Sequence, residues 1–462
     1  MARVLMKGNE AIAEAAIACG CRLYFGYPIT PQTEVAEYMA KRMPKVGGLC
    51  LQAESEIAAI NMVLGAAAAG ARVMTSSSSP GIALKSEGIS YIAGSDLPCL
   101  ILNVQRGGPG LGGIQPAQSD YNLAVKSAGH GDAHMVVYAP SSIQEIVDLT
   151  AVAFDVGDKY RVPVMMLADG ALGQMMEPVD LESLGERKPP EKPWATTGHG
   201  GLRKKNIINS LYIEPEELEE KVRARFERYA QIAEHEARWE EYKLGDAEIC
   251  LVAYGITARI CKTAVEMARR RGIKAGLFRP ITLWPYPSRQ LDEACRRAGV
   301  KRVLVAELNM GQMVDDVRLA GGVFNHRAPF GEGGGEHDVH RRADGDDVEI
   351  DRRALHTPVR RVGHDDAVLH IHRRAHGGKA LDVLVDGAHA AEIAAARHGD
   401  VGPAEPPEQR ADEVVRRADA PHEAERGVRR LHARGVDVNR VPVYDSDLRA
   451  NLLHDVQEHR YV

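Results

Sequence analysis

Short apolar runs alternate with helix-like segments from the beginning of the chain, and this order limits the folds that the chain can adopt. The apolar runs have the length of buried strands, and alanine-rich or amphipathic stretches separate them. Parallel strands need crossovers that are usually helical, so the order predicts an α/β domain, a mostly parallel sheet with helices on both faces. Strands are predicted at residues 23–26, 72–76, 99–104, 135–139 and 164–168, and helices at 56–69 and 142–156.

A second α/β unit follows a linker of different composition. The linker begins rich in proline and glycine, and its second part has the charged surface and apolar stripe of an amphipathic helix, predicted at 215–241. Beyond it, strands are predicted at 249–254, 275–278 and 302–307, with helices at 257–271 and 287–298. We therefore divide the chain into a first domain (1–180), a linker (181–245), a second domain (246–320) and a tail (321–462).

The tail differs from the rest of the chain in composition. Fourteen of the 18 histidines lie there, together with a single lysine, Lys379, and periodicity is poor. Three explanations stay open: sequence read out of frame through GC-rich DNA, a disordered segment, or a histidine-rich metal site, although the spacings match no recognised ligand set. We expect the tail to add nothing to catalysis and to leave the second sheet one strand short, with an open edge.

Charge and hydropathy exclude several classes of protein. A net charge of −6 argues against a general nucleic-acid surface, and no stretch approaches the ~20 apolar residues of a membrane span. Glu10 and Glu14 interrupt the apolar N-terminal stretch, which argues against a signal peptide. With neither a signal peptide nor a membrane span, we expect a cytoplasmic location. The seven cysteines form no C-x₂-C pattern, so we expect no iron–sulfur or zinc site here.

A proline-bracketed turn follows the first predicted strand. Thr30 suits a helix N-cap and Pro31 the first helical position, with a helical pattern after them. A threonine hydroxyl and free backbone N–H groups would then meet at the carboxyl end of a strand, where open α/β sheets bind ligands. A well-capped helix without a ligand explains these residues equally well.

Three further polar features follow predicted strands. Glu56 opens an alanine-rich helix, where the helix dipole alone favours a carboxylate. Arg106 ends a strand and offers a planar fork that matches a carboxylate, although a surface arginine is the alternative. The serines 76–79 could form caps and turns or could line a pocket.

The loop 108–113 matches the spacing of a dinucleotide fingerprint, G-x-G-x-x-G. We interpret it as a false match, because Pro109 and Pro116 bracket an irregular loop where that motif needs the start of a helix. Its glycines more simply let the backbone approach a cofactor or a partner chain.

Four segments in this order resemble the α subunit of the 2-oxoacid:ferredoxin oxidoreductases, and most closely their 3-methyl-2-oxobutanoate (2-oxoisovalerate) branch. The resemblance covers about residues 1–320. It implies a pyrimidine-binding domain of a thiamine enzyme followed by a domain like the C-terminal domain of transketolases. The segments are Tyr27-Pro28-Ile29-Thr30-Pro31, Gln52-Ala53-Glu54-Ser55-Glu56, Thr75-Ser76-Ser77-Ser78-Ser79-Pro80-Gly81 and Arg106-Gly107-Gly108-Pro109-Gly110.

The resemblance also implies roles for single residues. Glu56 would contact the aminopyrimidine ring of thiamine pyrophosphate, with Glu54 as the alternative if the register is wrong. Thr30 and Arg106 would hold the carboxylate of the 2-oxoacid, and together with Glu56 they are the catalytic candidates. The remaining cofactor-binding candidates are Tyr27, Pro28, Ile29, Ser78 and Gly81.

The Mg²⁺ motif of thiamine enzymes, Gly-Asp-Gly with a downstream Asn, is not found in the matching part of the chain. Its nearest approach is Ala168-Asp169-Gly170. The resemblance then implies that a β subunit supplies the Mg²⁺ and diphosphate site. A γ subunit and a ferredoxin-like subunit with iron–sulfur clusters would complete the enzyme, which would use ferredoxin and coenzyme A.

The implied reaction converts a 2-oxoacid, coenzyme A and oxidised ferredoxin into acyl-CoA, CO₂ and reduced ferredoxin. The expected substrate is 3-methyl-2-oxobutanoate, with 2-oxoglutarate and pyruvate as alternatives. A scaffold whose site has decayed is a further alternative, and the presence of Thr30, Glu56 and Arg106 argues against it.

Overall fold

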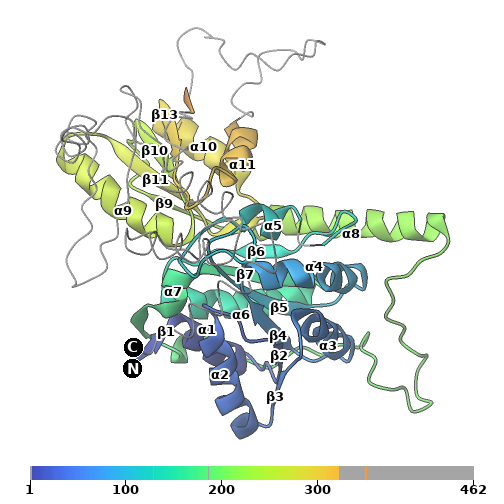
Figure 1. Ribbon diagram of the computed structural model, residues 1–462. Coiled ribbons are helices and arrows are strands. Elements are labelled where there is room, and N and C mark those ends of the chain that lie inside the picture. Colours follow the sequence, from blue (N-terminus) through green and yellow to red (C-terminus); the bar gives the residue numbers. More distant parts are fainter. Residues whose placement is uncertain (1–2, 128, 186, 322–348, 351–462) are drawn as a thin grey trace, which may run out of the picture. The chain divides into compact units, whose positions relative to one another are not determined.

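The computed structural model describes residues 3–127, 129–185, 187–321 and 349–350, all within one compact unit, Met1–Val385 (Figure 1). The first sheet has seven strands in the order β12-β6-β7-β5-β4-β2-β3, and all are parallel except β12. The five strands predicted for the first domain are confirmed to within one residue at each end. The strands are β2 (Leu23–Gly26), β3 (Leu49–Gln52), β4 (Val73–Ser77), β5 (Cys99–Gln105), β6 (Val136–Tyr138), β7 (Pro163–Asp169) and β12 (Thr282–Trp284).

Helices cover both faces of this sheet, which confirms the predicted α/β class. Leu100 and Leu102 of β5 face one group of helices, and Cys99 and Ile101 face the other, because side chains alternate along a strand. One face is covered by α1 (Gly8–Ala18), α2 (Thr33–Arg42) and α6 (Ile143–Tyr160), and the other by α3 (Glu56–Ala68), α4 (Ser79–Gly94) and α5 (Tyr121–Val125).

The second sheet has the order β14-β13-β10-β11-β9, with β9 antiparallel to β11 and the other pairs parallel. The strands and helices predicted for the second domain are confirmed, with ends that shift by up to two residues. The confirmed elements are β10 (Ile249–Val252), β11 (Ala275–Pro280), β13 (Arg302–Val305), α9 (Gly255–Arg270) and α10 (Ser288–Ala298). The structure adds three elements that the sequence did not predict: β9 (Trp239–Tyr242), α11 (Met313–Gly321) and β14 (Glu349–Ile350).

The amphipathic helix of the linker is shorter than the sequence predicts. It is α8 (Pro215–His235), and the residues that were expected to continue it to position 241 form β9 instead. The stripe residues Tyr229 and Ile232 are buried, whereas Leu218 and Phe226 remain exposed. Residues 239–242 lie at the edge of the second sheet and form backbone hydrogen bonds with β11. This long-range pairing overrides the local helical pattern.

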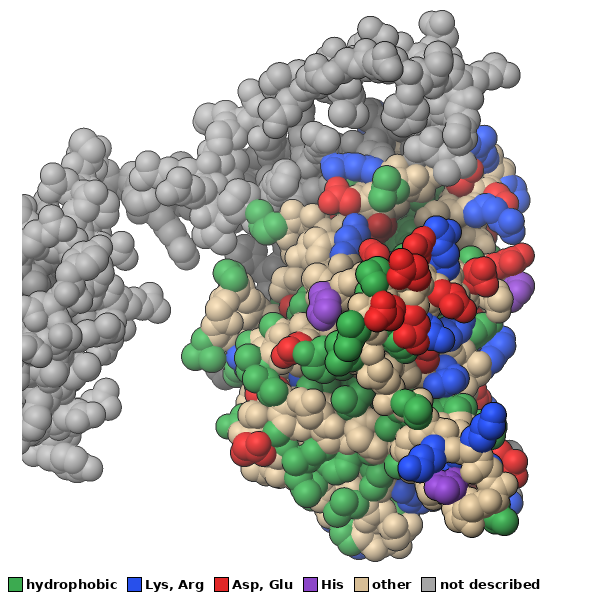
Figure 2. Space-filling model, turned by 90° about the vertical axis from the view of Figure 1, so that its right-hand side faces the viewer, with side chains coloured by type: hydrophobic (Ala, Val, Ile, Leu, Met, Phe, Trp, Pro, Cys, Tyr) green, Lys and Arg blue, Asp and Glu red, His purple; other side chains and the backbone are tan. Residues whose placement is uncertain are grey.

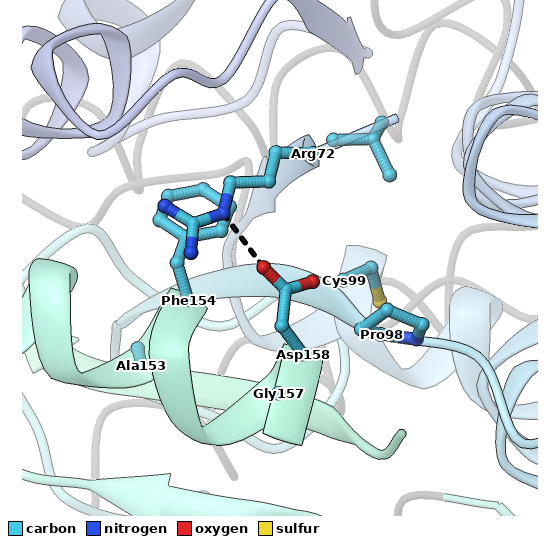
Figure 3. A pocket seen from close by; sticks show the side chains of 8 residues that line it. Arg72, Pro98, Cys99, Ala153, Phe154, Gly157 and Asp158 are labelled. Carbon is cyan, nitrogen blue, oxygen red and sulfur yellow. Dashed lines mark hydrogen bonds and ion pairs between the residues drawn. The ribbon is translucent and has the colours of Figure 1, made fainter. Parts of the chain in front are cut away.

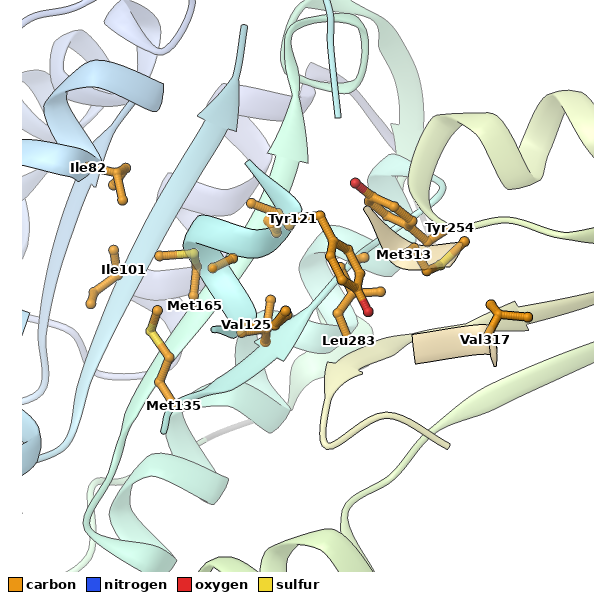
Figure 4. Packing of buried hydrophobic residues seen from close by; sticks show 14 of the residues in the cluster. Ile82, Ile101, Tyr121, Val125, Met135, Met165, Tyr254, Leu283, Met313 and Val317 are labelled. Carbon is orange, nitrogen blue, oxygen red and sulfur yellow. The ribbon is translucent and has the colours of Figure 1, made fainter. Parts of the chain in front are cut away.

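One hydrophobic core joins the two domains. Tyr121 on α5 and Tyr254, directly before α9, lie with ring centroids 5.7 Å apart, and Leu283 of β12 packs in the same cluster (Figure 4). β12 follows β11 of the second sheet in the chain but pairs with β6 of the first. Buried contacts therefore fix the two sheets against each other.

The remaining elements are short. β1 pairs antiparallel with β8 in a two-stranded sheet. These short elements are β1 (Val4–Lys7), η1 (Met43–Val46), α7 (Gly170–Gln174), β8 (Met176–Val179) and η2 (Glu182–Leu184). Within the described residues, no helix is both long and apolar enough to cross a membrane.

Most of the tail lies outside the described residues, and so do the predictions about its origin, its histidines and its packing. Two of its residues are described as β14, which pairs with β13 in parallel through Arg302–Glu349 and Val303–Ile350. The expectation that the second sheet keeps a wholly open edge beside β13 is therefore wrong, since two residues of that edge are paired.

Candidate active site

The candidate residues meet at the carboxyl edge of the first sheet. β2, β3, β4 and β5 are parallel, so their carboxyl ends lie at the same edge. Thr30 follows β2, Glu56 follows β3, Ser78 follows β4 and Arg106 follows β5. The sheet thus brings together residues that lie far apart in the sequence, at the edge where open α/β sheets bind ligands.

The Arg106 side chain is buried, with 6% of its surface exposed, and backbone carbonyls hold it. Its Nη1 donates to the carbonyl of Thr30 at 2.9 Å, and its Nη2 donates to the carbonyl of Leu111 at 3.0 Å. The Nε–H is buried and has no partner among the described residues. The guanidinium is therefore fixed in direction while it keeps one donor free.

The turn after β2 differs from its prediction. Helix α2 begins at Thr33 with Gln32 at the N-cap position, so Thr30 is not the cap and Pro31 is not the first helical residue. Gln32 closes the turn, because its backbone N–H donates to the carbonyl of Ile29 and its side chain donates to that of Tyr27. Thr30 and Pro28 are exposed, and Tyr27 and Ile29 are partly buried.

Glu56 is the first residue of α3, behind the N-cap Ser55, and 6% of its surface is exposed. Its carboxyl group lies against Gly81 of α4, where an added Cβ would be 2.6 Å from Glu56 Oε1 and 2.1 Å from Ser77 Oγ. Only glycine therefore fits at position 81 without displacing the carboxyl group. Glu54, the alternative candidate, is exposed.

A second glycine on α4 continues this close contact between the helices. A Cβ at Gly88 would lie 2.4 Å from Cγ2 of Ile60. Gly81 and Gly88 are two turns apart on α4, and they face Glu56 and Ile60, which are one turn apart on α3. The two glycines let α3 and α4 approach closely, and Gly81 leaves room for the Glu56 side chain at the N-terminal end of this helix contact.

The four serines 76–79 divide into two pairs. Ser76 Oγ lies 2.6 Å from the Tyr24 hydroxyl and donates to Gln32 Oε1, whereas Ser79 Oγ donates to Asp120 Oδ2 at 2.6 Å. The buried hydroxyls of Ser77 and Ser78 have no partner among the described residues, and Ser78 occupies the N-cap position of α4 without a side-chain cap bond. These two hydroxyls are free to meet a ligand.

The glycine-rich loop after β5 contains no helix start. Arg106 and Pro116 form an isolated antiparallel bridge across it, and the next helix is α5 at Tyr121. Gly110 and Gly112 have positive φ, and a Cβ at Gly112 would lie 1.8 Å from the carbonyl oxygen of Gly107. The loop is thus a tight backbone turn, and the predicted irregular loop without a helix start is confirmed.

Comparisons with known proteins agree with this geometry. Residues 14–241 match the family described as pyruvate flavodoxin/ferredoxin oxidoreductase, thiamine diphosphate-binding, and residues 247–339 match the pyruvate:ferredoxin oxidoreductase core domain II. The chain is 50% identical to the ketoisovalerate oxidoreductase subunit VorB of Methanothermobacter thermautotrophicus, over 70% of this chain and 91% of that protein. The chain belongs to the 2-oxoacid:ferredoxin oxidoreductase family.

The chain is also similar to proteins with lower identity. It is 36% identical to the 2-oxoglutarate synthase subunit KorA of Methanocaldococcus jannaschii, over 68% of this chain and 90% of that protein. A solved 2-oxoglutarate:ferredoxin oxidoreductase from Magnetococcus marinus is similar in fold, with a TM-score of 0.61 and 31% identity. The match covers 69% of this chain and 60% of that one.

The residues at the carboxyl edge of this oxidoreductase fit a polar ligand such as thiamine diphosphate. Ser77 Oγ, Ser78 Oγ and Arg106 Nε are buried groups without a partner in the described part of the chain, and such groups are costly unless a ligand or water satisfies them. The Glu56 carboxyl group and the Ser77 hydroxyl both lie against Gly81, in space that a Cβ would fill.

Asp169 lies in the segment that is most similar to the Mg²⁺ motif, and its carboxylate accepts hydrogen bonds from backbone N–H groups of this chain. Its carboxylate caps α7 by accepting from the N–H groups of Ala171 and Leu172, and the Ile256 N–H binds it as well. Burial raises the pKa of Asp169 to about 6, against the lowering effect of these N–H groups. Among the described residues, no cluster of three or more His, Cys, Asp or Glu could hold a metal ion.

His130 and His134 lie away from the candidate site. His130 is exposed, whereas His134 stacks on Trp284 with ring centroids 4.7 Å apart and meets Tyr229 of α8 edge-on. Burial lowers the pKa of His134. His134 therefore helps to attach α8 to the first sheet.

A small cavity of about 10 Å³ lies at the opposite, amino end of the strands (Figure 3). Phe154 and Pro98 line it, and Asp158 beside it accepts from Arg72 at 2.8 Å and pairs with Lys192 at 2.7 Å. The cavity has room for about one water molecule. Its wall of buried ion pairs stabilises the fold and is separate from the carboxyl edge.

The sequence analysis missed Lys85. This lysine of α4 is fully buried, and its Nζ donates to Thr75 Oγ1 at 2.6 Å and lies 3.4 Å from the carbonyl oxygen of Ser76. Burial lowers its pKa to about 7, and the Glu56 carboxylate opposes that shift. Lys85 lies one turn after Gly81, so a helical side chain there leans back toward the glycine. Its alanine-rich and serine-rich surroundings gave no local signal for a buried amine.

Proposed function

We propose that this chain supplies half of an active site that catalyses the oxidative decarboxylation of a 2-oxoacid. The products would be acyl-CoA, CO₂ and reduced ferredoxin. The observation that carries the proposal is the convergence of Glu56, Arg106 and two unpartnered serine hydroxyls at one sheet edge. Thiamine diphosphate, when bound there, would supply a carbanion that attacks the ketone of the 2-oxoacid.

Glu56 would hold a proton at the ring nitrogen of the aminopyrimidine. A carboxyl group there stabilises the protonated ring and makes its exocyclic amine a better base. Glu56 suits this role because it is buried, while the seat at Gly81 fixes its direction. Ser78, Gly81 and the turn at Tyr27, Pro28 and Ile29 would line the ring.

Arg106 and Thr30 would bind the carboxylate of the 2-oxoacid. The carbonyls of Thr30 and Leu111 orient the planar guanidinium of Arg106, whose shape matches a carboxylate. Its free Nε–H is the donor that a carboxylate would satisfy. The exposed Thr30 hydroxyl would add a second donor from the turn after β2.

Partner subunits would complete the site. We propose that a β subunit brings Mg²⁺ and the diphosphate site, and that a γ subunit and a ferredoxin-like subunit carry the electrons through iron–sulfur clusters to ferredoxin. The surface near Glu56 and Arg106 supports a docked subunit, because large apolar side chains are exposed there: Ile57, Leu84, Leu111 and Ile114 are between 50% and 84% exposed.

The proposed substrate is 3-methyl-2-oxobutanoate. The 50% identity to a ketoisovalerate oxidoreductase subunit exceeds the 36% identity to a 2-oxoglutarate synthase subunit, which supports the branched substrate over 2-oxoglutarate or pyruvate. The alternative of a catalytically inactive scaffold subunit is disfavoured because Glu56 and Arg106 are both present and both are held in place by their neighbours. We also propose a cytoplasmic location, which the seven unpaired cysteine thiols support.

Equilibrium binding of thiamine diphosphate would test this proposal. We expect the purified full-length chain to bind the cofactor weakly or not at all in calorimetry, and to bind it tightly after the β subunit and Mg²⁺ are added. The Glu56→Gln variant should weaken binding in the assembled enzyme, whereas Glu54→Gln should leave it unchanged. Equal binding by wild type and Glu56→Gln would overturn the assignment of the site.

A further inference from the structure

The side of α4 that packs against α3 carries a lysine between its two glycines. Lys85 lies one turn after Gly81 and just under one turn before Gly88, so the three residues share one side of the helix. Cβ atoms at the two glycines would meet Glu56 and Ile60 of α3, which identifies this side as the one that contacts α3. Lys85 therefore lies where helix packing usually requires an apolar or small residue.

The Lys85 side chain is closed off from solvent. Figure 2 views the molecule from the side on which α3 and α4 lie in Figure 1, and the lysines and arginines that it shows are at the surface. Lys85 is not exposed on this or any other face, because none of its surface is accessible. A helical side chain leans toward the N-terminus of its helix, so the amine points toward Gly81 and the Glu56 carboxyl group beside it.

The hydrogen-bond partners of the amine match its neutral form. Lys85 Nζ donates to Thr75 Oγ1 at 2.6 Å and to the carbonyl oxygen of Ser76 at 3.4 Å, and these are its two acceptors among the described residues. A neutral amine has two N–H donors, whereas an ammonium group has three. The charged form therefore keeps one donor unsatisfied and has only neutral oxygens around its charge, which is costly in a buried place.

The Glu56 carboxyl group lacks partners as well. It is 6% exposed, and in the described part of the chain it accepts no hydrogen bond and forms no ion pair within 4 Å. Its negative charge favours the ammonium form of Lys85, because opposite charges attract strongly where water is excluded. The two buried groups therefore compensate each other through space.

Other titratable or charged side chains lie around α4 on β2, on β5 and on the segment after β5. They are Tyr24, Cys99, Arg106 and Asp120. Burial raises the pKa of Cys99 to about 12 and also raises that of Tyr24, so both side chains stay neutral. Asp120 accepts hydrogen bonds from Ser79 and Asn103, and the charge of Arg106 acts on it. Glu56 therefore remains as the group of opposite charge for Lys85.

We propose that Lys85 is a positioning residue of the cofactor site, which balances the charge of Glu56 while the site is free and gives up its own proton when the aminopyrimidine ring binds. The proposal rests on the proposed function, because Glu56 must be the residue that meets the ring. Before binding, the ammonium group of Lys85 keeps the Glu56 carboxyl group ionised and ready to hold the proton of the ring.

The loss of the proton follows from charge balance in a buried site. A protonated ring beside Glu56 cancels the charge of that carboxylate and adds a positive neighbour to Lys85. Two positive charges with one negative charge are unfavourable there, so one N–H bond of Lys85 breaks. The electron pair stays on Nζ, the proton passes to solvent, and the two remaining N–H groups keep their bonds to Thr75 and Ser76.

Proton release on cofactor binding tests the proposal in the assembled enzyme. Calorimetric titration with thiamine diphosphate and Mg²⁺, in buffers of different ionisation enthalpy, counts the protons released. Burial lowers the pKa of Lys85 to about 7, so at about pH 6 wild type should release up to about one proton more than Lys85→Met. The difference should vanish near pH 9, where Lys85 is already neutral. The matched control is Lys192→Met, a buried lysine paired with Asp158 at the amino end of the strands, which should match wild type.

The pairing of Lys85 with Glu56 can also be measured in the free full-length chain, without cofactor. Glu56 favours the charged amine, so Glu56→Gln should lower the folded-state pKa of Lys85 still further. The stability difference caused by Lys85→Met should therefore level off below about pH 7 in the wild-type background. In the Glu56→Gln background it should continue to change toward lower pH. Chemical unfolding across this range measures both.

Several outcomes would overturn the proposal. They are equal proton release by wild type and Lys85→Met at about pH 6, an equal loss of proton release in Lys192→Met, or a levelling-off pH that Glu56→Gln does not change. A wild-type enzyme that binds no thiamine diphosphate with its partner subunits would overturn the proposed function, and this role of Lys85 with it. Binding with unchanged proton release would overturn the role of Lys85 alone.

Discussion

The Arg106 guanidinium donates a 2.9 Å hydrogen bond to the carbonyl of Thr30, a residue that lies 76 positions earlier in the chain. The two belong to the ends of different strands, β5 and β2, with β4 between them. The contact joins the two residues that we propose bind the substrate carboxylate. It also leaves the Arg106 Nε–H without a partner among the described residues.

Replacement of Arg106 should therefore weaken binding of the 2-oxoacid specifically. Loss of a charge-assisted contact costs roughly 1.5–3 kcal/mol, so Arg106→Ala should raise the KM for the 2-oxoacid about ten- to a hundredfold and change the KM for coenzyme A much less. Steady-state kinetics of the assembled enzyme with each substrate varied would measure both. Arg289→Ala on the exposed face of α10 is the control, and equal effects on both substrates would contradict the assignment.

Replacement of Glu56 should separate catalysis from folding. Glu56→Gln keeps the size of the side chain but cannot share a proton with the pyrimidine ring in the same way, so we expect decarboxylation to slow by about 10²–10⁴-fold. The thermal midpoint should stay close to that of the wild type. The control is Glu54→Gln, at an exposed position. Near-normal turnover in Glu56→Gln would show that another residue contacts the ring.

Gly81 offers a steric test of the same site. In Gly81→Ala the new Cβ would lie 2.6 Å from Glu56 Oε1, so the carboxyl group must move, and we expect thiamine diphosphate to bind at least about tenfold more weakly in calorimetry. Gly65 of α3 is a matched control, because a Cβ there meets nothing within 4 Å. Gly65→Ala should stabilise the helix by about 0.5–1 kcal/mol without affecting binding. Unchanged affinity in Gly81→Ala would separate this glycine from the cofactor.

Lys85 should make the stability of the chain depend on pH. Burial lowers its folded-state pKa from 10.5 to about 7, so between these values the unfolded chain binds the extra proton and stability rises with pH. Lys85→Met should be more stable than wild type near neutral pH, and its advantage should shrink by up to about 1.4 kcal/mol per pH unit as pH increases toward 10. Thermal unfolding of both proteins across this range measures the difference.

The control for this comparison is Lys301→Met, at a side chain that is 71% exposed. Its stability difference from wild type should not follow the Lys85 pattern between neutral and alkaline pH. A constant difference between wild type and Lys85→Met over the same range would mean that Lys85 does not titrate near neutral pH.

Sequence reasoning succeeded where a local pattern was sufficient. The strands of the first domain and the positions of α3 and α6 follow from apolar runs and helical patterns. In the structure, the side chains of Ser55 and Ser142 cap the starts of these two helices. It failed where a distant partner decided the outcome. The residues 239–242 read as the end of a helix but pair with β11, and Thr30 reads as a cap although α2 begins at Thr33.

The sequence by itself determined the α/β class, the strand positions and, through four motifs, the family. All three can be recognised from the periodicity of apolar residues and from short motifs, because they depend on residues that are close together in the sequence. Only the tertiary structure decided which hydroxyls are free, that Gly81 seats Glu56, and that Lys85 is buried beside them. Those facts depend on the order of strands in the sheet and on the distance between α3 and α4, which no local stretch of sequence specifies.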